Sequence, residues 1–333
     1  MSDSEQLPLF DIAAGQDAQG SQGAGAPVVK ISPVTPLGEA LTVYVDALHL
    51  GGFSEYTIKA FRSDLGLLLG WIGKDKPIGE IGAADLSRFL HWLLHERGVP
   101  CSPKSYARRV TALKNFFGYL SDMKFIGRDP STTLIQQSVD SPLPEVLTQE
   151  EITRVMEITQ AMRRNPDKPD ARPHLLVSLL LQTAIKKSEC MALRPADVDT
   201  TNPAAPLLWI RYANPRMRYK ERKIAILPEW LSVLDEYMYQ RQPRHEIFDC
   251  TARNLEYVLR DVATQTGVSN RRMSFEALRW TSALTDYVNG MDHDRLRQKL
   301  GLSRIAWRET SGKLAQLTRG AADLGGVEQD QGE

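Results

Sequence analysis

The first half of this chain takes its fold from one stretch, SYARRVTALKNFFGYL, which covers residues 105–120. Apolar residues recur in it at helical spacing, among them Val110, Leu113 and Phe117, and basic residues lie on the opposite face. A serine and a proline just before it are typical of a helix start, so we expect a helix that ends near Met123. Such a helix buries one face in a core and presents positive charge on the other.

Three further helical patterns precede this stretch. Apolar residues spaced by three and four predict helices over 37–51, 54–71 and 83–96. Together with the first helix they predict a compact four-helix domain over residues 37–125. Residues 126–146 contain three prolines and one glycine, which predicts a linker.

A second domain is predicted to begin near Thr148, which with Glu151 has the pattern of a capping box. Its predicted elements are helices over 148–164 and 172–193, strands over 207–212 and 223–227 joined by a basic turn, and helices after Pro228. The chain is therefore expected to be mainly α-helical. The second domain, over 147–314, is expected to be mixed and mostly helical, with a small antiparallel sheet.

The two ends of the chain are acidic and its body is basic. Residues 1–36, predicted to be a disordered tail, carry one lysine against four acidic residues, which gives a charge of −3. Residues 315–333 carry one arginine against four acidic residues, also −3, so the neutral chain has +6 on residues 37–314. A basic body between acidic tails favours a nucleic-acid binder, although small charge excesses are also common in other proteins.

Several other classes of protein are not favoured by the sequence. No apolar run reaches the ~18 residues of a membrane span, and the polar, acidic start does not have the pattern of a signal peptide. Three scattered cysteines indicate reduced thiols rather than a disulfide or zinc framework. His91 and His95 are four residues apart, but the pattern around them favours packing over metal binding. We expect a cytoplasmic, nucleoid-associated protein with no cofactor, no metal site and no membrane partner.

Motifs in both halves, taken in order, resemble the tyrosine recombinase/phage integrase family. YTIKAFRSDL (56–65) and the stretch 105–120 are similar to the first and last helices of the family's SAM-like core-binding domain. TAIKKSE (183–189) and EALRW (276–280) look like the two arginine motifs of its catalytic domain. The resemblance covers about residues 37–314, and it implies a DNA-binding domain followed by a catalytic-type domain.

The resemblance also implies a chemistry, which is transesterification of a DNA phosphate. In the family two arginines clamp the phosphate, a lysine on a hairpin assists the leaving oxygen, and a tyrosine near the C-terminus attacks. Here Lys186 stands in the place of the first arginine, and Glu189 of the same motif is retained. Arg279 keeps the second arginine, but both histidines of its motif are replaced. The expected remnant of the phosphate site is therefore Arg279, Lys186 and Glu189.

The remaining catalytic positions have also changed. The hairpin lysine aligns near Met217, with Lys220 as a substitute, and the later histidine or tryptophan position is Leu302. Ser311 occupies the position of the tyrosine, and Tyr287 is the last tyrosine of the chain. Because so many positions differ together, we expect a pseudoenzyme. An active enzyme would need Ser311, Tyr287 or a tyrosine from a partner subunit, and the sequence offers no base to activate a serine.

Basic and polar residues around both domains are candidate contacts to DNA phosphates, since two helices with one basic face each can straddle a duplex. The candidates in the first domain are Thr57, Lys59, Arg62, Lys104, Arg108, Arg109 and Lys114. Those in the second domain are Lys187, Arg216, Arg218, Lys220, Arg222, Arg271 and Arg272. A merely solvated basic surface is the alternative interpretation. The family also assembles several protomers on DNA, which implies a homo-oligomer or a hetero-oligomer with another recombinase.

A short motif in the N-terminal tail suggests a further partner. Gln6, Leu7, Leu9 and Phe10 match the peptide by which bacterial proteins bind the replicative sliding clamp. A flexible tail can present such a peptide to a groove. Packing of the tail on its own domain, or chance, remains an alternative.

Three functions follow from these observations. The leading hypothesis is a DNA-bound accessory or architectural factor that does not cut DNA. A divergent but active recombinase or integrase is the first alternative, and a sliding-clamp-associated adaptor is the second.

Overall fold

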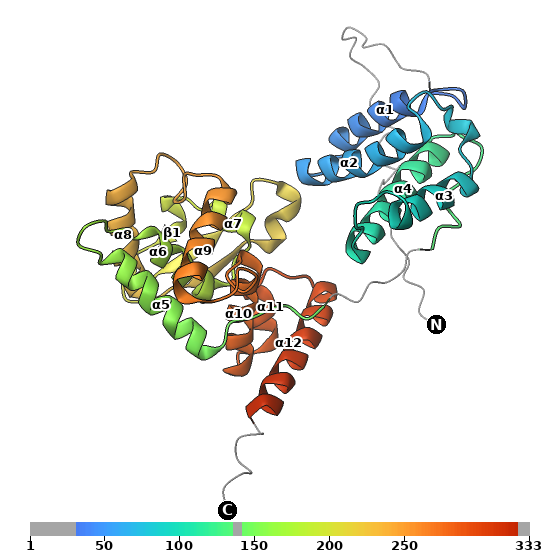
Figure 1. Cartoon of the computed structure of the whole chain (residues 1–333). Coiled ribbons are helices and arrows are strands. Elements are labelled where there is room, and N and C mark those ends of the chain that lie inside the picture. Colours follow the sequence, from blue (N-terminus) through green and yellow to red (C-terminus); the bar gives the residue numbers. More distant parts are fainter. Residues whose placement is uncertain (1–30, 136–141, 326–333) are drawn as a thin grey trace, which may run out of the picture. The chain divides into compact units, whose positions relative to one another are not determined.

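The computed structural model describes residues 31–135 and 142–325, and these form two compact units on either side of Ser141 and Pro142 (Figure 1). The expected clamp-binding residues Gln6, Leu7, Leu9 and Phe10 lie outside the described residues. Both units are mainly helical, as predicted from the hydrophobic spacing. Within the described ranges, no helix is long and apolar enough to cross a bilayer.

The first unit is the predicted bundle of four helices with a short 3₁₀ turn between the second and third. Its elements are α1 (Leu37–Leu50), α2 (Glu55–Ile72), η2 (Ile78–Glu80), α3 (Ala83–His95) and α4 (Pro103–Asp122). The helices begin where the sequence offers caps. Ser54 accepts a hydrogen bond from the Thr57 amide before α2, and Ser102 accepts one from the Ser105 amide before α4.

The core of the first unit combines aliphatic side chains with aromatic ones from α1, α3 and α4. Tyr44, Phe89, Phe116 and Phe117 are fully buried, and the rings of Tyr44 and Phe116 meet edge to face at 5.2 Å. Burial of each such side chain stabilises the fold by roughly 1.5–3 kcal/mol. This core fixes α4 against α1 and α2, so the basic face of α4 has a defined place.

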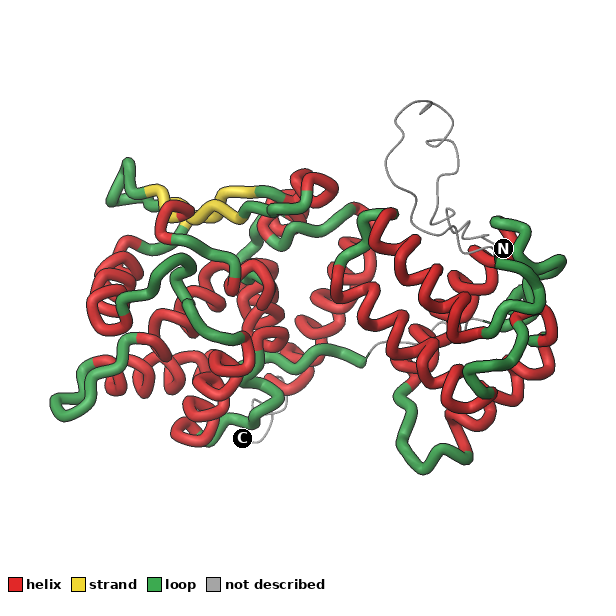
Figure 2. Tube along the Cα trace, turned by 90° about the horizontal axis from the view of Figure 1, so that it is seen from above, coloured by secondary structure: helices red, strands yellow, loops and turns green. Residues whose placement is uncertain are grey.

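The second unit contains a three-stranded sheet beside its helices (Figure 2). Its elements are α5 (Gln149–Arg163), α6 (Arg172–Thr183), α7 (Lys187–Met191), η3 (Pro195–Asp197), β1 (Val198–Asp199), β2 (Leu207–Ile210), η4 (Pro215–Lys220), β3 (Arg222–Ala225), α8 (Pro228–Arg241), α9 (Ala252–Thr266), α10 (Phe275–Val288), α11 (His293–Lys299) and α12 (Arg304–Gly325). The strands pair antiparallel in the order β1-β2-β3, and Leu208 of β2 lies opposite Ile224 of β3. The predicted small antiparallel sheet is confirmed.

The predicted single helix over 172–193 is wrong, because the chain breaks at Ala184. Ala184 has φ 52° and ψ 29°, a left-handed conformation that ends α6 and costs roughly 1–2 kcal/mol for a residue other than glycine. The break could not be predicted from hydrophobic spacing, because apolar residues continue on both sides of it. The break matters because it makes Lys186 the N-cap of α7 and turns Glu189 into the interior.

The core of the second unit surrounds α6, which packs against α5, α8, α9 and α10. Leu175, Leu176, Leu179 and Leu180 of α6 are completely buried. A smaller apolar cluster around Ala184 holds the C-terminal helices, with Leu314 of α12 buried in it. The break after α6 therefore lies between the main core and the last two helices.

Candidate remnant phosphate site and basic surfaces

Arg279 on α10 is bound to two backbone carbonyls. Its Nη1 donates to the carbonyl of Ala184, at the break after α6, and its Nη2 donates to the carbonyl of Leu300 at 2.7 Å. Burial lowers the pKa of Arg279 to about 10, and the nearby charge of Glu189 opposes this shift. Arg279 thus joins three segments of the chain, and these bonds occupy one N–H of each Nη atom.

Glu189 forms a closed ion pair with Arg222 of β3. Their side chains are 1% and 8% exposed, and both Nη atoms of Arg222 donate to the carboxylate, at 3.0 and 2.9 Å. The amide of Lys186 donates to the same carboxylate at 2.8 Å, and the hydroxyl of Tyr212 also donates to it. Burial by itself raises the pKa of Glu189, but Arg222 and these hydrogen bonds outweigh it and hold the pKa at about 2.

Arg222 was predicted to contact DNA, and the structure places it in the interior. Besides the carboxylate, its Nε donates to the carbonyl of Lys299 at 2.6 Å, and its Nη1 also reaches the carbonyl of Lys220. Every nitrogen of this guanidinium therefore has an acceptor inside the unit. This could not be predicted from the sequence, because Arg222 follows a basic turn and resembles its exposed neighbours.

Lys186 and Arg279 line one cavity, of about 820 Å³, together with residues of α9 and α10. Burial lowers the pKa of Lys186, which the charge of Glu189 opposes. Glu276, at the position of a family histidine, lines the same cavity. The neighbouring Lys187 is exposed and its ammonium lies 2.8 Å from the carboxylate of Glu256. The cavity is thus lined by several basic residues together with Glu256 and Glu276.

Helix α9 adds basic residues that the sequence argument missed. Arg253, Tyr257 and Arg260 line the same cavity, and the Tyr257 ring is 45% exposed. The guanidinium of Arg260 lies 4.6 Å from the centre of that ring, and Nε of Arg253 donates to the Tyr257 hydroxyl at 2.8 Å. Their spacing of four and three residues on one helix could have revealed them. Arginines beside an exposed aromatic ring are suited to phosphate and base contacts.

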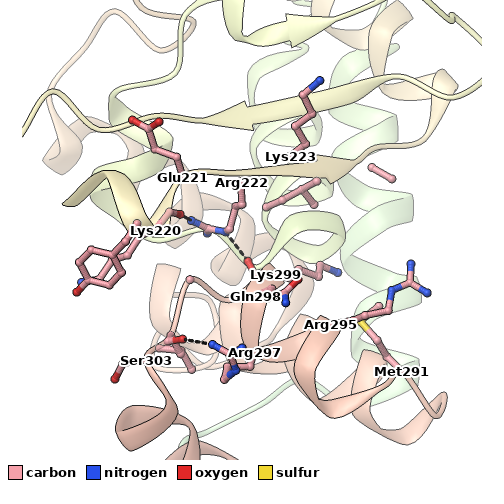
Figure 3. Close-up of a pocket in the computed structure, with 15 residues that line it drawn as sticks. Lys220, Glu221, Arg222, Lys223, Met291, Arg295, Arg297, Gln298, Lys299 and Ser303 are labelled. Carbon is pink, nitrogen blue, oxygen red and sulfur yellow. Dashed lines mark hydrogen bonds between the residues drawn. The ribbon is translucent and has the colours of Figure 1, made fainter. Parts of the chain in front are cut away.

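A second cavity, of about 870 Å³, lies between β3 and α11 (Figure 3). Lys220, the expected substitute for the hairpin lysine, and Leu302, at the later histidine or tryptophan position, line this cavity and not the one that holds Lys186. Figure 3 shows Arg222 reaching from β3 towards the Lys299 carbonyl of α11. The Lys220 ammonium lies 3.8 Å from the Met217 sulfur.

The expected catalytic positions therefore line two cavities, although Lys220 is close enough to Lys186 for its charge to help lower the pKa of that lysine. Ser311, at the nucleophile position, lies on α12, lines neither cavity, and donates its hydroxyl to the carbonyl of Arg308 at 3.2 Å. The Tyr287 ring packs in the cluster around Ala184 and stacks on His293 with 5.3 Å between ring centres. Neither side chain is paired with a base in the described residues.

The other predicted DNA contacts of the second unit have mixed surroundings. Arg272 donates to both carboxylate oxygens of Glu151. The side chain of Arg271 is 87% exposed, and its Nη1 lies 3.7 Å from Oε1 of Glu145. Arg218 is exposed on η4. Arg216 belongs to the same turn, and its side chain lies outside the described part of the chain.

In the first unit, Arg108 and Arg109 of α4 share one buried carboxylate. Arg108 donates to Asp64 of α2 at 2.9 Å while its side chain stays 48% exposed. Arg109 is only 12% exposed and lies 3.5 Å from the same oxygen. Both were predicted to contact phosphates, and the structure leaves only Arg108 accessible.

The remaining candidates of the first unit lie on the surface or near it. Lys59, Arg62 and Lys104 are exposed, and Lys114 is half-buried. Within residues 31–135 none of these four side chains makes an ion pair. The hydroxyl of Thr57 lies 2.8 Å from that of the capping residue Ser54, so its polar group serves the start of α2. This surface therefore retains unpaired positive charge on α2 and α4.

Two protein-family profiles match the chain, one in each unit. Residues 42–124 match "Phage integrase, N-terminal SAM-like domain", and residues 145–308 match "Phage integrase family". Together they span most of the described residues.

Individual relatives are similar over parts of the chain. Tyrosine recombinase XerC of Xanthomonas campestris pv. campestris (strain B100) is 28% identical over 198 residues, which are 59% of this chain and 56% of that protein. Tyrosine recombinase XerD of Haemophilus influenzae is 31% identical over 144 residues, 43% of this chain and 46% of that protein. The chain spans about half the length of the curated relatives it matches.

Solved structures share the fold at low sequence identity. The XerH site-specific recombinase, in a post-cleavage complex with a palindromic difH substrate, has a TM-score of 0.65 and 16% identity over 88% of this chain and 97% of that one. A lambda integrase dimer bound to a COC' core site has a TM-score of 0.62 and 14% identity over 83% and 77%. With both profiles matched in order on this fold, the chain belongs to the tyrosine recombinase, or phage integrase, family.

Proposed function

We propose that this protein binds double-stranded DNA and does not cut it. The observation that carries the proposal is the state of Arg279. The one arginine retained from the phosphate clamp donates to the carbonyls of Ala184 and Leu300, so it ties the fold together. A clamp on a scissile phosphate needs these donors directed at the oxygens where charge develops.

The rest of the site supports the loss of cleavage. Lys186 keeps a positive charge at the first clamp position, but a lysine cannot give the two parallel hydrogen bonds of an arginine. The Ser311 hydroxyl is hydrogen-bonded to a backbone carbonyl and to no base in the described residues, and an unactivated serine is a poor nucleophile. The cavity that holds Lys186 and Arg279 still suits a bound phosphate, because binding needs positive charge but no nucleophile.

The proposed DNA contacts lie on two surfaces, one in each unit. In the first unit they are the exposed basic residues of α2 and α4, chiefly Lys59, Arg62, Lys104 and Arg108. In the second unit they include the α9 surface around Tyr257. Contacts of this kind neutralise phosphates, so the affinity should fall steeply as salt rises.

We further propose that the bound protein acts as an accessory or architectural factor on chromosomal DNA in the cytoplasm. A chain that binds DNA but does not cleave it can hold a site or assemble there with an active recombinase. A second copy of this chain is the other proposed partner.

A nicked suicide substrate tests the proposal, because an active tyrosine recombinase becomes trapped on it through a covalent bond. The unaltered protein should retard duplex DNA on a native gel and give no adduct on a denaturing gel. Ser311→Tyr should also give no adduct, since Arg279 and Lys186 do not supply a phosphate clamp. An adduct with the unaltered protein would support the alternative of a divergent active recombinase. Absence of any retarded complex at low salt would contradict DNA binding.

The tail motif supports a second proposal, that the protein docks on the sliding clamp. Leu9 and Phe10 would fill apolar pockets and supply ~1.5–3 kcal/mol each, offset by the ordering of the tail. A peptide of residues 1–15 should bind purified clamp with micromolar affinity, and Leu9→Ala with Phe10→Ala should abolish binding. Calorimetry that detects no binding at high micromolar peptide would exclude this role.

A further inference from the structure

Asp64 occupies a position on α2 where an apolar residue is expected. It lies in the core-facing stripe of that helix, next to Leu65 and one turn after Phe61, and its side chain is only 2% exposed. A buried carboxylate is costly unless opposite charge compensates it. Burial raises the pKa of Asp64, and the charges of Arg108 and then Arg109 act against that shift.

The two arginines are bound to Asp64 in different ways. Arg109 is nearly buried, lies 3.5 Å from Oδ1, and donates through Nη1 to the sulfur of Cys101 at 2.7 Å. Arg108 donates a single bond, from Nη2 to the same Oδ1 at 2.9 Å. Its Nε and Nη1 have no acceptor among the described residues. Both arginines therefore oppose the buried carboxylate, Arg109 from a nearly buried position without a hydrogen bond to it and Arg108 through one hydrogen-bonded nitrogen, with its Nε and Nη1 free.

We propose that Asp64 and Arg109 are positioning residues, which hold the Arg108 guanidinium at the surface of α4 as a preformed phosphate contact. With Asp64 ionised, the net charge of the three groups is +1, and Arg108 is the member that a phosphate can reach. A guanidinium with one fixed nitrogen loses less freedom when it binds a phosphate than a free one does. This inference rests on the proposed DNA binding of the first unit.

A double-mutant cycle on the full chain tests the inference. Asp64→Asn adds one positive charge, so electrostatics alone predicts tighter binding to a duplex. If Asp64 positions Arg108, the substitution should instead weaken duplex binding by about fivefold, because the Arg108 guanidinium is no longer fixed. In an Arg108→Ala background the same substitution should cause no loss. Asp46→Asn is the control, since Asp46 is exposed on α1 and its substitution adds the same charge away from Arg108.

Two results would overturn the inference. One is an Asp64→Asn protein that binds at least as tightly as Asp46→Asn. The other is an equal loss with and without Arg108, which would indicate a general structural effect. If Asp64→Asn lowers the unfolding midpoint, Asp64→Asn with Arg109→Met removes both buried charges, keeps the net charge, and should show the same Arg108-dependent loss.

A second measurement separates this inference from the proposed function. In the nitrogen NMR spectrum of the free protein, rotation of the Arg108 guanidinium should be slow in the unaltered chain and fast in Asp64→Asn. Fast rotation in both proteins would overturn positioning, whatever the DNA result. Slow rotation in the unaltered chain without duplex binding would contradict only the proposed function.

Discussion

Asp64 in the first unit and Glu189 in the second are both buried beside arginine, and the two clusters differ in whether the arginine keeps donors at the surface. In the second unit, Glu189 takes both Nη atoms of Arg222, and the Nε of Arg222 is bound to a carbonyl. In the first unit, Asp64 is shared by a buried Arg109 and a half-exposed Arg108. The Glu189 cluster is closed, whereas the Asp64 cluster keeps an arginine, Arg108, with free donors at the surface.

The number of basic residues in a sequence is therefore not the positive charge that a ligand can reach. Arg222, Arg272 and Arg279 were all candidates for a phosphate, and each is engaged by acceptors of its own unit. The basic residues of α2 and α4 have few such acceptors. In this chain, basic residues of the second unit are thus turned inward, while α2 and α4 keep an outward basic face.

The largest expected effect comes from opening the closed cluster. Glu189→Gln leaves Arg222 buried without a counter-charge, so the free energy of unfolding should fall by roughly 3–5 kcal/mol. Urea unfolding of the full chain measures this loss. Glu256→Gln is the control, because it breaks the half-exposed pair with Lys187 and should cost less than about 1 kcal/mol. Equal effects of the two substitutions would show that the Glu189 cluster is not closed.

Acid should act on the same cluster. The folded pKa of Glu189 is about 2, below its ordinary value of 4.5, so its contribution is fully present above pH 4.5 and is lost as pH falls towards 2. The contribution at stake is about 3 kcal/mol. Unfolding free energies from pH 6 to pH 3 should therefore fall more steeply for the unaltered chain than for Glu189→Gln. Parallel curves would contradict the low pKa.

Arg279→Lys should have a smaller effect on stability. A lysine cannot bridge the carbonyls of Ala184 and Leu300, so the free energy of unfolding should fall by about 2 kcal/mol. Thermal unfolding checks this value. An unchanged midpoint would mean that the bonds of Arg279 to the two carbonyls do not stabilise the fold. Arg279 would then again be a candidate for binding phosphate.

The sequence predicted the architecture well because hydrophobic spacing and caps are local signals. The helix start at Ser102 and the capping box at Thr148 lie where the pattern put them. The break at Ala184 could not be predicted, since an alanine in a left-handed conformation leaves no trace in the apolar pattern.

The candidate site was predicted in part, because motif positions give residue identities but no contacts. Lys186 and Arg279 do line one cavity, as their motifs implied. The partner of Glu189 was missed, because Arg222 lies 33 residues away on a strand. The buried state of Arg109 was also missed, although an aspartate in the apolar stripe of α2 was a visible sign of a buried ion pair.

The most direct test compares Arg108→Ala with Arg279→Lys in a salt titration of duplex binding. Arg108→Ala should weaken binding by about fivefold and reduce the slope of log affinity against log salt by about one. Arg279→Lys, measured on folded protein, should change neither the affinity for the duplex nor the salt slope by a detectable amount. A larger loss for Arg279→Lys than for Arg108→Ala would contradict the account, because it would place the working phosphate contact in the remnant site.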